Sequence, residues 1–105
     1  MKSKEKIELI VNSNDVDSAT KTLLDICFNP NDWKWVQDIC LSLITANKNE
    51  DVRRLAVTCL GHLARIHSTI EKEKVIPFLK KIKKGDINIA GTIDDALDDI
   101  NMFAG

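Results

Sequence analysis

Apolar residues recur at the spacing of an α-helix along most of this chain, and this periodicity constrains the fold more than any other feature. The most regular stretch covers about residues 51–66. Its apolar positions form one stripe, made of Val52, Leu55, Ala56, Cys59, Leu60, Leu63 and Ile66. The chain has no Tyr, only four Gly and two Pro, a composition that suits neither the turns nor the aromatic strands of a β-sandwich. The pattern therefore predicts an all-α protein.

Capping residues and helix breakers divide the chain into about six helices. The expected ranges are about 4–12, 16–28, 33–46, 51–66, 75–84 and 92–103. The expected N-caps are Ser3 for the first helix, Asn14 or Asp15 for the second, Asp32 for the third and Thr92 for the sixth. Gly85 is expected to end the fifth helix in the left-handed conformation. Because Pro77 suits only a first turn, residues 69–74 are either a loop or an extra turn.

The helices repeat with a period of about 36–37 residues. The matching positions are Asp15-Val16, Asp51-Val52 and Asn88-Ile89, then Leu24, Leu60 and Leu97, then Cys27, Leu63 and Ile100. A two-helix unit of this length cannot bury its apolar face alone, and stacked neighbours complete the core. We therefore expect residues 1–105 to form one domain, a short α-solenoid of helix pairs with the first helix as a cap.

One unit carries a family resemblance. The segment from Asp51-Val52-Arg53-Arg54-Leu55-Ala56 to Cys59-Leu60-Gly61-His62-Leu63 resembles the first helix of a HEAT-like repeat, and Val75-Ile76-Pro77-Phe78-Leu79 resembles the second. The resemblance covers about residues 51–84, whereas residues 15–46 and 88–103 match it only in spacing. It implies that Ala56 and Gly61 let neighbouring helices approach closely.

The net charge of -1 conceals a segregated charge distribution. Residues 71–84 contain six Lys and two Glu, whereas residues 85–105 contain five Asp and no basic residue. The near-zero total argues against a simple nucleic-acid binder. The lysines of the fifth helix, Lys80, Lys81, Lys83 and Lys84, suit either a solvated helix C-terminus or contacts with phosphate.

The candidate partner-binding residues are four aspartates and a tryptophan. Asp94, Asp95, Asp98 and Asp99 share one face of the sixth helix. Since like charges four residues apart repel, Asp98 and Asp99 indicate either a cationic partner or pairing with the basic fifth helix. Trp33 continues a core stripe, whereas Trp35 points elsewhere and either covers the first helix or anchors an interface.

Catalytic and metal chemistry receive little support from the sequence. It has no Gly-rich phosphate loop and no nucleophile elbow, and the Cys59 and His62 pair lacks a second pair of ligands. We therefore expect no catalytic residue, metal or cofactor. Cys27, Cys40 and Cys59 have core spacing, which is typical of small buried residues in a reducing cytoplasm. No apolar run is long enough to span a membrane.

A solenoid of this size most resembles the bacterial immunity proteins that neutralise toxin domains of contact-dependent inhibition or other polymorphic toxin systems. The resemblance implies a non-catalytic protein-binding module that occludes a cationic toxin domain, such as a nuclease, without a small-molecule substrate. The alternatives are a nucleic-acid binder, which would use Arg53, Arg54, Arg65 and the lysine cluster, and an adaptor subunit of a larger assembly. The acidic sixth helix argues against the nucleic-acid binder.

Overall fold

The computed structural model describes residues 3–28, 32–68 and 70–104. Its elements are α1 (Lys4–Val11), α2 (Val16–Phe28), α3 (Trp33–Ala46), α4 (Glu50–His67), α5 (Lys72–Gly85), the short 3-10 helix η1 (Ile87–Ile89) and α6 (Ala90–Phe103). No strand occurs among the described residues. The prediction of an all-helical chain with six α-helices is therefore confirmed.

The starts of the first three helices follow from their capping residues. The side chains of Ser3 and Asp32 accept hydrogen bonds from the backbone N–H groups of Lys6 and Trp35, three residues further on. Asp15 does the same for Ser18, so Asp15 and not Asn14 caps α2. Each cap satisfies one of the N–H groups that the first helical turn leaves without a partner.

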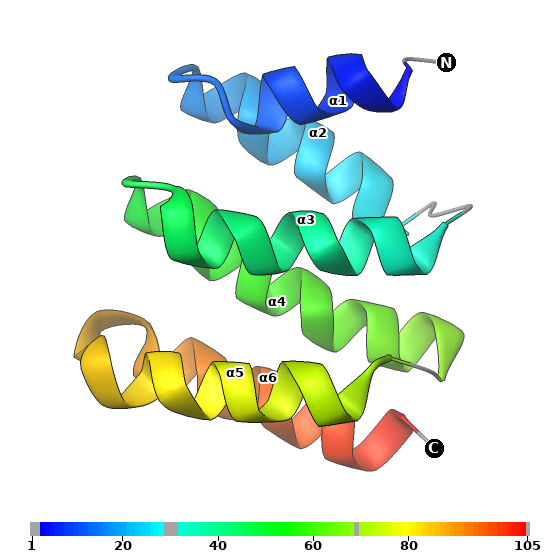
Figure 1. The fold of residues 1–105 in the computed structure, drawn as a ribbon, viewed down its shortest axis with the longest axis vertical. Helices are drawn as coiled ribbons and strands as arrows, with labels where there is room; N and C mark the ends of the chain where they lie inside the picture. Colours follow the sequence, from blue (N-terminus) through cyan, green and yellow to red (C-terminus); the bar gives the residue numbers. More distant parts are fainter. Residues whose placement is uncertain (1–2, 29–31, 69, 105) are drawn as a thin grey trace.

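The helices form two layers, with α1, α3 and α5 in one and α2, α4 and α6 in the other (Figure 1). Helix α4 is central, since it packs against α2, α3 and α6. The pairs α1–α2, α3–α4 and α5–α6 follow one another along the longest axis of the molecule, which measures 32 Å. Helices separated by one repeat period therefore lie in the same layer.

The core lies between the layers and is formed mainly by the predicted stripes. Leu60, Leu63 and Leu79 are fully buried, and so is Ala56. A Cβ atom on Gly61 would lie 3.1 Å from Oδ2 of Asp99 and 3.4 Å from Cα of Ala96, so the missing side chain lets α4 and α6 approach closely. Trp33 is only partly buried, at the edge of the core.

Two expected core positions lie on the surface instead. Leu24 is 36% exposed and Ile66 is 47% exposed. Both residues continue an apolar stripe in the sequence, but the structure leaves a large part of each side chain accessible to solvent. The stripe on α4 is therefore narrower at its C-terminal end than the periodicity suggests.

Helix α5 begins at Lys72, three residues before the predicted start at about residue 75. Pro77 is therefore the sixth residue of the helix. The extension starts beside a fully buried Gln37 on α3. Gln37 Nε2 donates to Oε1 of Glu71 at 2.7 Å, and Glu71 N–H donates to Gln37 Oε1 at 3.0 Å. These two bonds tie the start of α5 to α3 and offset the poor placement of the proline.

The predicted connection between the last two helices is wrong in two respects. Gly85 does not have positive φ and is the last residue of α5, which is followed by Asp86 in an extended conformation. Helix α6 begins at Ala90, so Gly91 and Thr92 lie inside it and Thr92 is not the N-cap. The intervening 3-10 turn is capped by Asp86, whose side chain accepts from Asn88 N–H. This turn replaces the loop that the glycines suggested.

Candidate protein-binding surface

The four aspartates of α6 occupy different environments. Asp94 forms an ion pair with Lys83 of α5, with Oδ1 and Nζ 2.5 Å apart. Asp95 and Asp98 are exposed, and Asp99 lies partly buried beside Gly61 of α4. Pairing with the basic helix therefore accounts for Asp94, whereas no such ion pair is found for the other three carboxylates among the described residues.

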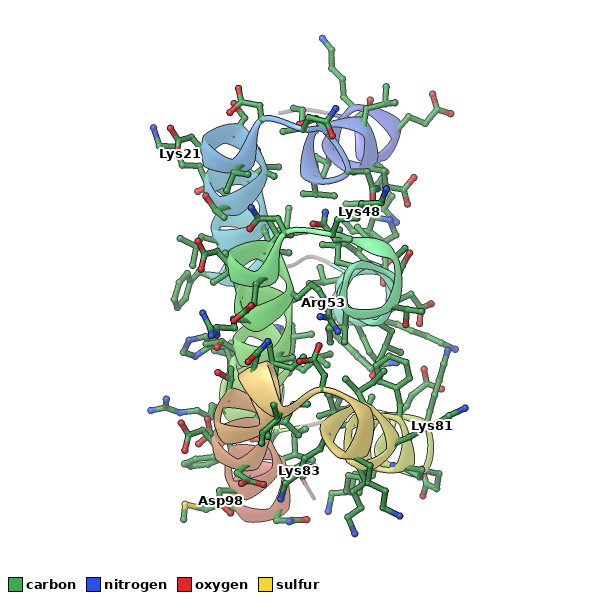
Figure 2. All side chains as sticks on the ribbon, turned by 90° about the vertical axis from the view of Figure 1, so that its left-hand side faces the viewer. Lys21, Lys48, Arg53, Lys81, Lys83 and Asp98 are labelled. Carbon is green, nitrogen blue, oxygen red and sulfur yellow. The ribbon has the colours of Figure 1, made fainter. Side chains whose placement is uncertain are left out.

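Figure 2 shows how the acidic and basic sides are separated. Asp98 lies at the outer edge of α6, and Lys81 lies at the opposite edge of the molecule on α5. Lys83 lies between these two helices. Among the described residues, the ion pair between Lys83 and Asp94 joins α5 to α6. The exposed side of α5 is mainly basic, with Glu73 among its lysines, whereas the exposed charged residues of α6 are all acidic.

Exposed apolar side chains accompany the acidic residues on α2, α4 and α6. Met102 is 75% exposed and lies one turn after Asp98, while Phe103 follows Asp99 at the same spacing. Phe28 of α2 is 50% exposed, and its ring centroid lies 5.2 Å from that of His62 on α4. The Arg65 guanidinium lies 5.7 Å from the Phe103 ring centroid. These contacts connect the three helices of one layer.

We refer to this surface as the aromatic–acidic face. It comprises Phe28, His62, Arg65, Ile66, Asp95, Asp98, Asp99, Met102 and Phe103. Aromatic residues, Met and Arg are enriched at protein interfaces. The face carries three carboxylates against one guanidinium, so its potential favours a cationic partner.

Trp35 does not belong to this face. It lies on α3 in the other layer, where its Nε1–H donates to Oε1 of Glu8 on α1 at 3.1 Å. Nζ of Lys4 lies 5.0 Å from its ring centroid. Of the two interpretations left open by the sequence, the structure favours a tryptophan that packs against the first helix. The predicted site residues thus fall into two separate groups.

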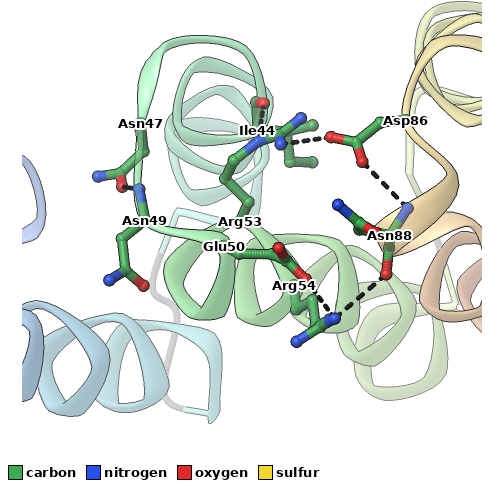
Figure 3. Close-up of polar contacts among 8 residues, drawn as sticks. All are labelled: Ile44, Asn47, Asn49, Glu50, Arg53, Arg54, Asp86 and Asn88. Atoms are coloured by element: carbon green, nitrogen blue, oxygen red, sulfur yellow. Dashed lines mark hydrogen bonds and ion pairs between the residues drawn. The ribbon is translucent and has the colours of Figure 1, made fainter.

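Arg53 and Arg54, which a nucleic-acid binder would use, are engaged within the protein (Figure 3). Arg53 Nε donates to the carbonyl of Ile44 at 2.8 Å, and its Nη1 lies 2.5 Å from Oδ2 of Asp86. Arg54 pairs with Glu50 and donates to the carbonyl of Asn88 at 3.2 Å. These arginines connect α4 with the end of α3 and with the connection between α5 and α6.

The hydrogen bond from Arg53 lowers the pKa of Asp86 below the ordinary value of an aspartate. The carboxylate also accepts from the backbone of the 3-10 turn, which acts in the same direction. Both contacts favour the charged form of Asp86. The guanidinium of Arg53 is therefore engaged in holding Asp86 and is not a free cation on the surface.

The three cysteines are fully buried, as their spacing predicted. The contact with Cys59 and burial both raise the pKa of the Cys27 thiol, which disfavours the reactive thiolate. In the described ranges, no group of three or more His, Cys, Asp or Glu side chains is arranged to hold a metal ion. The ring of His62 contacts the ring of Phe28.

Sequence reasoning missed Phe28, Met102 and Phe103 as parts of the surface. Met102 and Phe103 lie four residues after Asp98 and Asp99, so helical spacing could have placed them on the same face of the last helix. Phe28 offered none, because it directly continues the apolar pattern of α2 and its exposure depends on where α4 packs.

Comparisons with protein-family models, with curated proteins and with solved structures find no match for this chain. No helix within the described part of the chain is both long and apolar enough to cross a membrane.

Proposed function

We propose that this chain is a short HEAT-like solenoid that acts as a non-catalytic protein-binding module. The two layers support this proposal, since α2, α4 and α6 lie in one layer at the repeat period and α1, α3 and α5 in the other. The tight contact at Gly61 and the burial of Ala56 agree with what the repeat resemblance implies. Solenoids use such extended layers to bind macromolecules.

The aromatic–acidic face is the single observation that carries the proposal. Its exposed Phe28, Met102 and Phe103 would lose water on binding, which favours association. The carboxylates of Asp95 and Asp98 would attract a basic surface and orient it before contact. The partner is therefore a protein with a cationic surface that contains apolar side chains.

We further propose that the partner is a toxin domain, such as a nuclease, and that this chain is its cytoplasmic immunity protein. A toxin that acts on nucleic acid needs a basic substrate-binding surface. An acidic, partly apolar face is complementary to such a surface and would block the access of its substrate. This mechanism requires no cofactor, no metal and no small-molecule substrate.

The test uses the C-terminal domain of the polypeptide encoded immediately upstream of this chain. We expect its expression to arrest bacterial growth and co-expression of this chain to restore it. A variant with Asp95→Asn, Asp98→Asn and Asp99→Asn should lose the protection. The matched control neutralises three exposed lysines of α5 through Lys80→Gln, Lys81→Gln and Lys84→Gln.

The control should protect as well as the wild type, and circular dichroism should show that both triple variants are folded. A growth arrest that wild-type protein does not relieve would refute the immunity function. Equal protection by both triple variants would leave the immunity function in place but exclude the aromatic–acidic face as the binding surface.

A further inference from the structure

A second candidate site lies in the other layer, between α1 and α3. A cavity of about 300 Å³ is lined there by Glu8, Asn12, Trp35, Asp38, Ile39 and Ser42. Its lining combines an indole, two carboxylates and the buried apolar side chain of Ile39. Because α1 and α3 belong to the layer opposite the aromatic–acidic face, this site is independent of the proposed function.

The indole of Trp35 is held in place and is already in contact with one cation. Its Nε1–H donates to Glu8, which fixes the orientation of the ring. Nζ of Lys4 lies 5.0 Å from the ring centroid, within the range of a cation–π interaction. Trp35 lines the cavity, whereas Lys4 is not among the residues that line it.

The two carboxylates come from the two helices that line the cavity. Glu8 comes from α1, and Asp38 lies one helical turn after Trp35 on α3. Asp38 accepts one hydrogen bond through Oδ1 from Lys74, at 3.2 Å, and its side chain is half exposed. A carboxylate can accept several hydrogen bonds on its two oxygens, so Asp38 keeps capacity for another donor.

We propose that this cavity binds the side chain of an arginine from a protein partner. A guanidinium is planar, stacks on an indole and offers five N–H donors, which suits a cavity walled by an indole and two carboxylates. The hydroxyl of Ser42 and the side-chain carbonyl of Asn12 provide further acceptors on the wall. A lysine ammonium would satisfy the carboxylates but could not stack over the ring with a flat face.

The test is an NMR titration of the full-length protein that follows the indole N–H signals, with that of Trp35 assigned from a Trp35→Phe variant. The probe is N-acetyl-arginine amide, and its control is N-acetyl-citrulline amide, which has nearly the same shape but no charge. We expect a saturable shift of the Trp35 signal by the arginine probe, with a Kd on the order of 1–10 mM for so small a ligand. The citrulline probe should cause no saturable shift.

Two variants show which side chains are responsible. Asp38→Asn should weaken binding of the arginine probe by about fivefold or more, because one of the two carboxylates becomes neutral. Glu73→Gln, which removes an exposed carboxylate of α5 outside the cavity, should leave the Kd unchanged. The proposal is overturned if the arginine probe gives no saturable shift, if citrulline binds equally well, or if Asp38→Asn has no effect.

Discussion

The pair of hydrogen bonds between Gln37 and Glu71 predicts a large loss of stability from a single buried substitution. Gln37 is fully buried, and its two bonds are the 2.7 Å contact with the Glu71 carboxylate and the 3.0 Å contact with the Glu71 N–H. Gln37→Met keeps nearly the same volume and removes both bonds. Its effect therefore reports on the hydrogen bonds more than on packing.

The magnitude follows from the type of each bond. A hydrogen bond to a charged group contributes about 1.5–3 kcal/mol, and one between neutral groups about 0.5–1.5 kcal/mol. Glu71 is partly exposed and regains some water in the variant, so we expect the free energy of unfolding to fall by about 2–3 kcal/mol. Urea denaturation measures this fall, and we expect the slope of the unfolding free energy against urea concentration to stay the same.

A nearby ion pair provides the matched control. Lys74 and Asp38 connect the same two helices, but their side chains are 55% and 50% exposed. Removing that pair with Lys74→Met should change the free energy of unfolding by less than about 1 kcal/mol. If Gln37→Met costs less than about 0.5 kcal/mol, or no more than the control, then the buried amide does not hold the start of α5.

Three further predictions concern the packing, the pH dependence and the thiols. Gly61→Val should destabilise the protein by about 1–3 kcal/mol in urea, because its side chain would collide with Ala96 of α6, and an unchanged midpoint would contradict the close approach. The pKa of Asp86 is lower in the folded protein than in the unfolded chain. The ion pair with Arg53 therefore stabilises the protein fully at pH values above the ordinary aspartate pKa, and this contribution is lost as the pH falls through the pKa of Asp86 in the folded protein. The stability difference between wild type and Asp86→Asn should therefore shrink on acidification, and a difference that grows would refute this account. The raised pKa of Cys27 and the burial of all three thiols predict that a thiol reagent reacts only as fast as the protein unfolds, whereas a rapid phase in native buffer would contradict it.

The helix boundaries could be predicted wherever their cause is local. Ser3 and Asp32 act on amides three residues away, so the starts of α1 and α3 follow from short stretches of sequence. The start of α5 depends on Gln37, which is 34 residues away in the chain and offers no local signal. The connection after Gly85 depends in the same way on Arg53, which binds Asp86 from another helix.

The candidate surface shows the same division between local and distant causes. Helical periodicity placed the four aspartates on one face of α6, but only the packing of α5 decides that Lys83 neutralises Asp94. Periodicity also separated Trp35 from the core stripe of α3 without showing that Glu8 would hold its indole. Exposure of Phe28 depends on the position of α4, so the apolar half of the surface emerged only from the three-dimensional arrangement.

The most direct test of the central claim is the association rate constant between this chain and the growth-inhibiting domain, measured by stopped flow at several salt concentrations. At about 50 mM salt, neutralising Asp95, Asp98 and Asp99 should slow association by about tenfold or more, because electrostatic steering is lost. At about 500 mM salt the rates of wild type and variant should converge, since screening removes the same attraction. Equal association rates for the two proteins at low salt would contradict the claim that the aromatic–acidic face recognises a cationic partner.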